Sequence, residues 1–85
     1  MSFLKKDIQL YGAARCHKTQ HYINFFQKKN ILFTFFDVEE EEAYAEALRN
    51  LYENRKLNFP TIMIKGKKLR NPNDNDLLKW LTKKQ

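Results

Sequence analysis

The sequence predicts an α/β domain in which four strands form one mixed sheet flanked by helices, in the order βαβαββα. Two short apolar runs, at residues 8–11 and 31–36, are separated by a helical pattern, which indicates a parallel strand pair with a right-handed crossover. A proline-led apolar run and a lysine-rich run then predict a hairpin, and a leucine-rich helical pattern follows it. Because no repeat or linker interrupts this order, we expect one domain over residues 1–85.

The first half of the chain alternates between strand and helix patterns. Ile8–Tyr11 is a short strand that Gly12 ends. The helix that follows, from about Cys16 to Lys28, carries an apolar face at three-and-four spacing. The next strand, residues 31–36, is β-branched and aromatic, so we expect it to be buried on both faces. The apolar face of the helix consists of Thr19, Tyr22, Ile23 and Phe26.

The middle of the chain predicts a second helix that starts in an acidic run. Asp37 is a suitable cap, and Glu39 to Glu42 would lie in the first turns, where the helix dipole favours negative charge. The acidic run is therefore interpreted as a helix start and not as a metal site. The apolar stripe of this helix consists of Tyr44, Ala47, Leu48, Leu51 and Tyr52.

The last third predicts a hairpin and a final helix. Residues 58–64 form a strand led by Pro60, and Lys65-Gly66 turns the chain into a short lysine-rich edge strand at 67–70. Residues 71–74 break this strand and cap the helix after it. We expect Trp80 to half-cover the sheet, and the side chains that face inward are Leu77, Leu78 and Leu81.

The composition argues against several classes of protein. The formal net charge is +6, but the lysines gather at both ends and in residues 65–68, with no alternating basic and aromatic surface, so we expect no nucleic-acid partner. No run approaches the roughly 20 apolar residues of a membrane span, and residues 1–7 lack the apolar run of a signal sequence. A single cysteine permits no internal disulfide, which favours a cytoplasmic protein with a reduced thiol. We also expect a monomer. The lysines at the ends are Lys5, Lys6, Lys79, Lys83 and Lys84.

The only cysteine, Cys16, lies where the first strand pattern gives way to a helix. Unpaired N–H groups and the helix dipole stabilise an anion at such a position, so we expect a lowered thiol pKa and a reactive thiolate. Arg15 and His17 are expected to add to this effect. Thr19 occupies the position at which many redox proteins carry a second cysteine, so any disulfide chemistry must recruit an outside thiol.

His17 and His21 permit a second interpretation of this helix. They share a face at i and i+4 and could bind a metal together with Cys16. Cys16, however, points about 100 degrees away from His17 on a helical wheel, and only three candidate ligands exist. We therefore expect no metal.

The order of the elements resembles the glutaredoxin branch of the thioredoxin-like fold over Ile8 to Leu81, and three local motifs carry the resemblance. Tyr11, which we expect to support the site, stands five residues before Cys16 in a Cys-x-x-Thr motif. Asn58-Phe59-Pro60-Thr61 stands where the family usually has Thr-Val-Pro, and Asp76-Leu77 matches the last helix. The resemblance implies a cis Phe59–Pro60 bond against Cys16, with the backbone of Phe59 presented to an extended substrate.

The resemblance also implies a function in cell redox homeostasis. Cys16 would attack a glutathione mixed disulfide or a protein disulfide, and glutathione, as co-substrate, would release the product. The family usually has a lysine three residues before the cysteine and paired glycines before the last helix; here Ala13, Pro72 and Asn73 occupy those positions. Arg15, Lys18, Arg55 and Lys56 could replace the lost positive charge. Backbone donors to an anion would come from the helix start at Asp74, Asn75 and Asp76.

Two alternatives from other functional classes stay open. The chain could be a non-catalytic or redox-sensing binding module of the same fold. It could also carry an iron-sulfur cluster between two subunits, as family members with Cys-Gly-Phe-Ser do. His17 and Lys18 place bulky charged side chains where those members have Gly-Phe, which makes this second alternative the less favoured one.

Overall fold

Seven elements follow one another in the order βαβαββα, as predicted. We describe residues 7–82 of a computed structural model, so Lys5, Lys6, Lys83 and Lys84 lie outside the described residues. None of the helices in residues 7–82 is long and apolar enough to cross a membrane. The elements are β1 (Ile8–Gly12), α1 (His17–Lys28), β2 (Thr34–Asp37), α2 (Glu42–Asn50), β3 (Thr61–Ile64), β4 (Lys67–Arg70) and α3 (Asp74–Thr82).

The four strands form one mixed sheet in the order β2-β1-β3-β4. β1 is parallel to β2, with Gly12 opposite Asp37, and antiparallel to β3, with Tyr11 opposite Thr61. The carboxyl ends of β1 and β2 and the beginning of β3 therefore meet at one end of the sheet. This register brings three loops together: the one that carries Cys16, the one that follows β2 and the one that contains Pro60.

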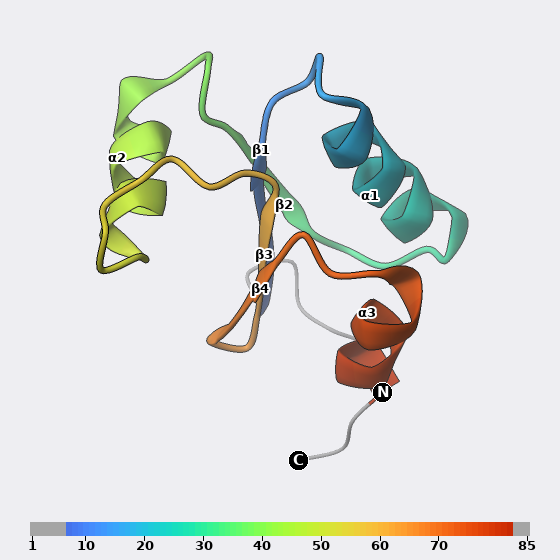
Figure 1. Cartoon of the computed structure of the whole chain (residues 1–85). Helices are drawn as coiled ribbons and strands as arrows, with labels where there is room; N and C mark the ends of the chain where they lie inside the picture. The colour runs from blue at the N-terminus through green and yellow to red at the C-terminus, as the bar shows by residue number, and fades with distance from the viewer. Residues whose placement is uncertain (1–6, 83–85) are drawn as a thin grey trace.

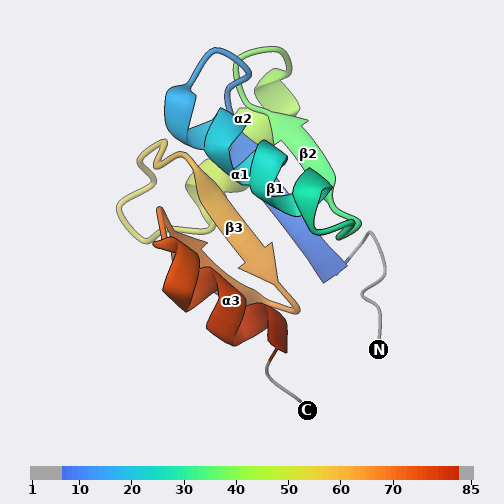
Figure 2. The same cartoon turned by 90° about the vertical axis from the view of Figure 1, so that its right-hand side faces the viewer.

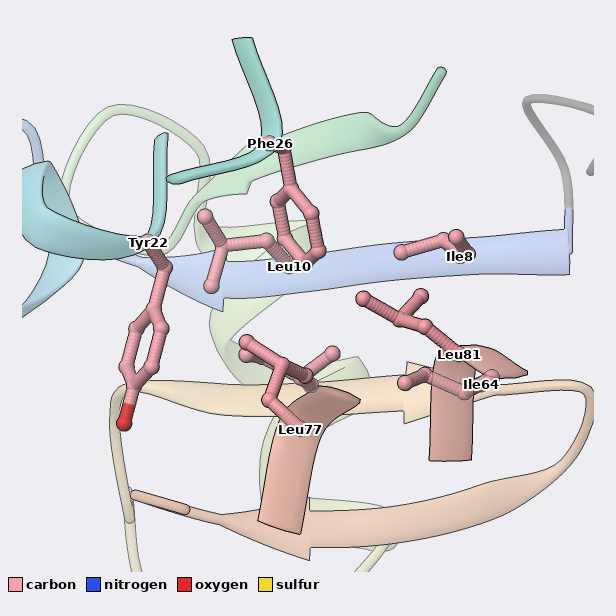
Figure 3. Close-up of a cluster of buried hydrophobic side chains, with 8 residues drawn as sticks. Ile8, Leu10, Tyr22, Phe26, Ile64, Leu77 and Leu81 are labelled. Carbon is pink, nitrogen blue, oxygen red and sulfur yellow. The ribbon is translucent and has the colours of Figure 1, made fainter. Parts of the chain in front are cut away.

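The helices cover both faces of the sheet. Figure 1 shows the sheet nearly edge-on, with α2 on one side and with α1 and α3 on the other, and Figure 2 shows α1 and α3 in front of the strands. Figure 3 shows the main core between the sheet and these two helices. Its buried members are Ile8, Leu10, Tyr22, Phe26, Ile62, Ile64, Leu77 and Leu81.

A second, smaller apolar cluster lies beneath α2. The predicted stripe of α2 is largely confirmed, since Leu48 is fully buried and Tyr44, Leu51 and Tyr52 pack in this cluster. The small residue at its centre is Ala45, however, and not Ala47, which is half-buried. On the other face, Trp80 is half-buried against the main core, as expected.

The prediction for the second strand was wrong in two respects. β2 begins at Thr34 and not at Ile31, and its four residues are half-buried instead of buried on both faces. The reason is its place at the edge of the sheet, where one side of the strand has no neighbour. Leu32, which was expected inside this strand, is 59% exposed. The third strand is also shorter than predicted, because it begins at Thr61, after the proline.

The acidic run before α2 is mostly a turn. α2 begins at Glu42, so Glu39 to Glu41 precede the helix and do not form its first turns. Asp37 Oδ1 accepts hydrogen bonds from the backbone N–H groups of Glu39, at 2.9 Å, and Glu40, at 3.2 Å. Asp37 therefore caps the turn that follows β2 and not the helix itself.

Candidate functional site

Cys16 is the N-cap residue of α1, one position before its first helical residue. Its backbone is extended, with φ −84° and ψ 126°, and its side chain makes no capping hydrogen bond to the helix. Its N–H donates to the Ala13 carbonyl at 2.9 Å, and its carbonyl accepts from the Gln20 N–H at 2.9 Å. The thiol is half-buried, so it stays accessible to a substrate while the helix start holds its backbone.

The surroundings of Cys16 lower the pKa of its thiol. Burial raises that pKa, but the stabilisation of a thiolate by the Thr19 N–H, the Thr19 hydroxyl and the Lys18 N–H outweighs this effect, and the Lys18 charge adds to it. These donors belong to the first turn of α1, where N–H groups have no carbonyl partner within the helix. The expected thiolate character therefore comes from Thr19 and Lys18.

Thr19 is held in place by the loop before the helix. It is fully buried, and its hydroxyl oxygen accepts the Ala13 N–H at 3.3 Å, which leaves its proton for the sulfur. A Cβ at Gly12 would lie 2.4 Å from Thr19 Oγ1, closer than real Cβ atoms come to such neighbours. The glycine that ends β1 therefore makes room for the hydroxyl that serves the thiol.

Arg15 lies beside the thiol, but a carboxylate on another element binds it. Its guanidinium donates to both Glu39 carboxylate oxygens, at 2.8 and 2.6 Å. Glu39 raises the pKa of Arg15, and Cys16 adds a smaller effect in the same direction. His17 is exposed at the first position of α1. Arg15 and His17 are the sequence neighbours of Cys16, but the groups that lower the pKa of its thiol are on Thr19 and Lys18, and Arg15 has a competing partner in Glu39.

The segment before β3 is tied to its neighbours around a cis peptide bond between Phe59 and Pro60. The buried Thr61 hydroxyl donates to the Asn58 carbonyl at 2.6 Å and lies 2.8 Å from the Tyr52 hydroxyl. The Pro60 carbonyl accepts the Asn71 N–H at 3.1 Å. Phe59 packs in the α2 cluster together with Tyr11, whose ring stacks on Phe36 at 5.0 Å.

A pocket of about 490 Å³ lies between α1 and the segment that leads into α3. Across it, His21 Nε2 lies 2.8 Å from Asp74 Oδ1. The Tyr22 hydroxyl donates to the Pro72 carbonyl, with the Asn71 side chain 3.2 Å away. Burial and the Asp74 charge raise the pKa of Tyr22 to about 12. The lining residues are Lys18, His21, Tyr22, Asn71, Pro72, Asn73, Asp74 and Asn75.

The structure brings some of the sequence-predicted binding residues to this pocket and leaves others away from it. Asp74 and Asn75 line it, whereas the Asp76 N–H is taken by the Asn73 side chain at 2.8 Å. Arg55 donates to Glu46 at 2.6 Å and also to Asn50, both on α2. Lys56 is exposed outside the lining.

His21 and Tyr22 were not among the predicted binding residues. Together with Lys18 they lie at positions i, i+3 and i+4 of α1, so helical periodicity could have placed all three on one face. Their role in the pocket depends on α3, which lies more than 50 residues later in the chain. Among residues 7–82, no three His, Cys, Asp or Glu side chains gather as a possible metal site.

Comparisons with known proteins identify the family and the fold. The thioredoxin-like protein BC3987 has a TM-score of 0.74 to this chain at 24% identity, covering 87% of this chain and 99% of that chain. A mutant of the same protein has a TM-score of 0.75 at 24% identity, covering 88% and 99%. The glutaredoxin (grx-1) from Archaeoglobus fulgidus has a TM-score of 0.71 at 15% identity, covering 88% and 84%. No curated protein matches significantly.

These structural neighbours are under 25% identical and show the thioredoxin-like fold alone. The family model named Glutaredoxin matches residues 8–69, from the start of β1 into β4, a span that includes Cys16 and Pro60. The chain therefore belongs to the glutaredoxin family.

Proposed function

We propose that this chain is a monothiol, glutathione-dependent thiol–disulfide oxidoreductase that uses Cys16 as its nucleophile. The family supports a thiol–disulfide oxidoreductase type of function in general. The observation that carries the specific proposal is the lowered pKa of Cys16, to which Lys18 contributes, because Lys18 also lines the pocket between α1 and the start of α3. A single thiol is sufficient for this chemistry, because free glutathione can supply the second sulfur.

In the first step, the Cys16 thiolate attacks the glutathione sulfur of a protein–glutathione mixed disulfide. A sulfur–sulfur bond forms between Cys16 and glutathione as the protein–glutathione bond breaks, and the protein thiolate leaves and takes up a proton. The lowered pKa of Cys16 keeps more of the thiol in its reactive form near neutral pH. The backbone of Phe59, before the cis bond, is the edge along which the substrate would extend.

In the second step, a glutathione thiolate attacks the glutathione sulfur bound to Cys16. The product is oxidised glutathione, and the Cys16 thiolate leaves and is ready for another cycle. The hydrogen bonds from Thr19 and Lys18 stabilise this leaving group as they stabilise the resting thiolate. Each cycle consumes one free glutathione and converts it, together with the protein–glutathione mixed disulfide, into the protein thiol and oxidised glutathione, in a compartment that supplies glutathione, such as the cytoplasm.

The pocket offers donors to a carboxylate of glutathione where the usual family contacts are missing. Ala13 has no charged group, so no cation is offered from that position, whereas Lys18 lines the pocket and forms no ion pair within residues 7–82. At the start of α3, Asn73 accepts the N–H groups of Asp76 and Leu77. The earlier N–H groups of the helix have no carbonyl partner within it and can bind an anion.

The deciding experiment is turnover of a glutathionylated peptide at millimolar glutathione, followed as oxidised glutathione. We expect activity in the parent and none in Cys16→Ser. Lys18→Gln should raise KM by roughly tenfold, because it removes one charged donor from the pocket. Lys28→Gln is the matched control, since it makes the same charge change at the other end of α1. If Cys16 of the parent is alkylated readily but the parent turns over no glutathionylated peptide, the proposal is wrong and the binding-module alternative replaces it.

A further inference from the structure

Asp37, the last residue of β2, joins the turn after β2 to the loop that carries the thiol. Its Oδ2 accepts the Ala14 N–H at 3.2 Å, while its Oδ1 accepts the N–H groups of Glu39 and Glu40. The adjacent Val38 N–H donates to the Gly12 carbonyl at 2.9 Å, which continues the pairing of Gly12 with Asp37. One carboxylate therefore fixes the loops that follow β1 and β2. The two loops lie at the same end of the sheet (Figure 1).

The loop between β1 and α1 is a tight turn, and side chains outside the turn bind both the N–H and the carbonyl of Ala14. The Cys16 N–H closes it by donating to the Ala13 carbonyl at 2.9 Å. Ala14, inside this turn, is exposed, yet its carbonyl accepts the Gln20 side chain at 2.6 Å and its N–H is bound by Asp37. The conformation of this turn sets the position of the Cys16 side chain, and therefore whether the sulfur faces the donors on Lys18 and Thr19.

We propose that Asp37 is a positioning residue for the Cys16 thiolate, and that its hydrogen bond to Ala14 keeps the sulfur against the first turn of α1. This inference rests on the proposed use of Cys16 as the nucleophile. Both carboxylate oxygens of Asp37 accept backbone N–H groups, so we assign it no contact with the substrate. It acts through the conformation of the loop.

Positioning and simple charge predict opposite effects when the carboxylate is removed. A negative charge near a thiolate disfavours it, so loss of that charge alone would lower the pKa of Cys16. Loss of the anchor would instead let the sulfur move away from its donors, and the pKa would rise towards the ordinary value of a thiol. The charged or titratable side chains in the loop before α1, in the first five residues of α1 and in the turn after β2, Cys16 itself aside, are Arg15, His17, Lys18, His21, Glu39, Glu40 and Glu41. On the adjacent elements, Tyr11 of β1 packs in the α2 cluster and Asp74 of α3 contacts His21.

The test measures the pH dependence of Cys16 alkylation by iodoacetamide in three variants of the full chain. Asp37→Asn removes the charge and turns one accepting oxygen into a donor, and we expect the alkylation midpoint to rise by about one pH unit. Asp37→Glu keeps the charge but moves the carboxylate, and its midpoint should rise as well. Glu40→Gln is the matched control, because it makes the same charge change in the same turn on an exposed side chain, and its midpoint should stay with the parent.

A midpoint that falls or stays unchanged in folded Asp37→Asn overturns the proposal, as does an unchanged midpoint in Asp37→Glu if the first variant does not fold. Amide exchange in the unaltered protein gives a readout that needs no variant: the Ala14 N–H should exchange at least tenfold more slowly than a free loop amide. Free exchange at Ala14 would contradict the proposal. Alkylation uses no glutathione, so a failure of glutathione turnover would leave this result standing.

Discussion

Thr19→Val is expected to reduce the reactivity of the thiol while leaving the fold intact. Valine keeps the shape of threonine but replaces the hydroxyl with a methyl group. The hydroxyl oxygen accepts the buried Ala13 N–H, at a long 3.3 Å, and the hydroxyl lowers the pKa of Cys16. Leaving a buried N–H unsatisfied costs about 1–3 kcal/mol, and the length of this bond puts the expected loss near 1 kcal/mol.

The effect on Cys16 follows from the number of its donors. The hydroxyl is one of three donor groups that lower the pKa of the thiol, beside the N–H groups of Thr19 and Lys18. Because Cys16 is half-buried, water replaces part of the lost bond. We therefore expect the alkylation midpoint of Thr19→Val to rise by about half to one pH unit.

The assay pairs the pH profile of iodoacetamide alkylation with urea unfolding of the same samples. Thr19→Ser is the matched control, since it keeps the hydroxyl and loses only a methyl group; its midpoint should stay with that of the parent. A Thr19→Val midpoint equal to the parent's, or a Thr19→Ser midpoint that rises as far as that of Thr19→Val, would refute the role of the hydroxyl.

Three further predictions concern stability. Gly12→Ala should lower the free energy of unfolding by about 1–3 kcal/mol, because its Cβ would lie 2.4 Å from the Oγ1 of the fully buried Thr19. Urea titrations measure this change, and a stability equal to the parent's would contradict the contact. The folded chain releases the Cys16 proton at lower pH than the unfolded chain, so the stability of the reduced parent, relative to Cys16→Ser, should increase as the pH rises through the folded pKa towards about 8.5. Unfolding at several pH values tests this, and a flat difference would argue against a stabilised thiolate. Burial raises the Tyr22 pKa from 10 to about 12, so the unfolded chain loses this proton at a lower pH than the folded chain, and the free energy of unfolding should fall between pH 10 and about 12. Tyr22→Phe has no such proton, so its free energy of unfolding should lack this part of the decrease.

Much of the fold could be predicted because strands and helices of this chain carry their own local patterns. The spacing of Tyr22 and Phe26 placed α1 within one residue of its observed start, and Lys65-Gly66 predicted the β3–β4 hairpin. The β2 prediction failed because an apolar run looks the same in a central strand and in an edge strand. Only the sheet order shows that β2 has a neighbour on one side.

The candidate site was predicted less completely, because its charges are paired across the fold. Arg15 and Arg55 were equal candidates with Lys18 in the sequence. Glu39 binds Arg15 from the turn after β2, and Glu46 binds Arg55 from α2. These contacts leave Lys18 as the cation that lines the pocket.

The sequence by itself determined the order of the elements and the place of Cys16 at a helix start, because both depend on residues only a few positions apart. The tertiary structure alone decided which groups hold the loop before Cys16 and which charges are paired around it, because strand register brings together groups far apart in the chain. Asp37 is the clearest case: it is 23 positions from Ala14, and only the pairing of β1 with β2 places its carboxylate on the loop before Cys16.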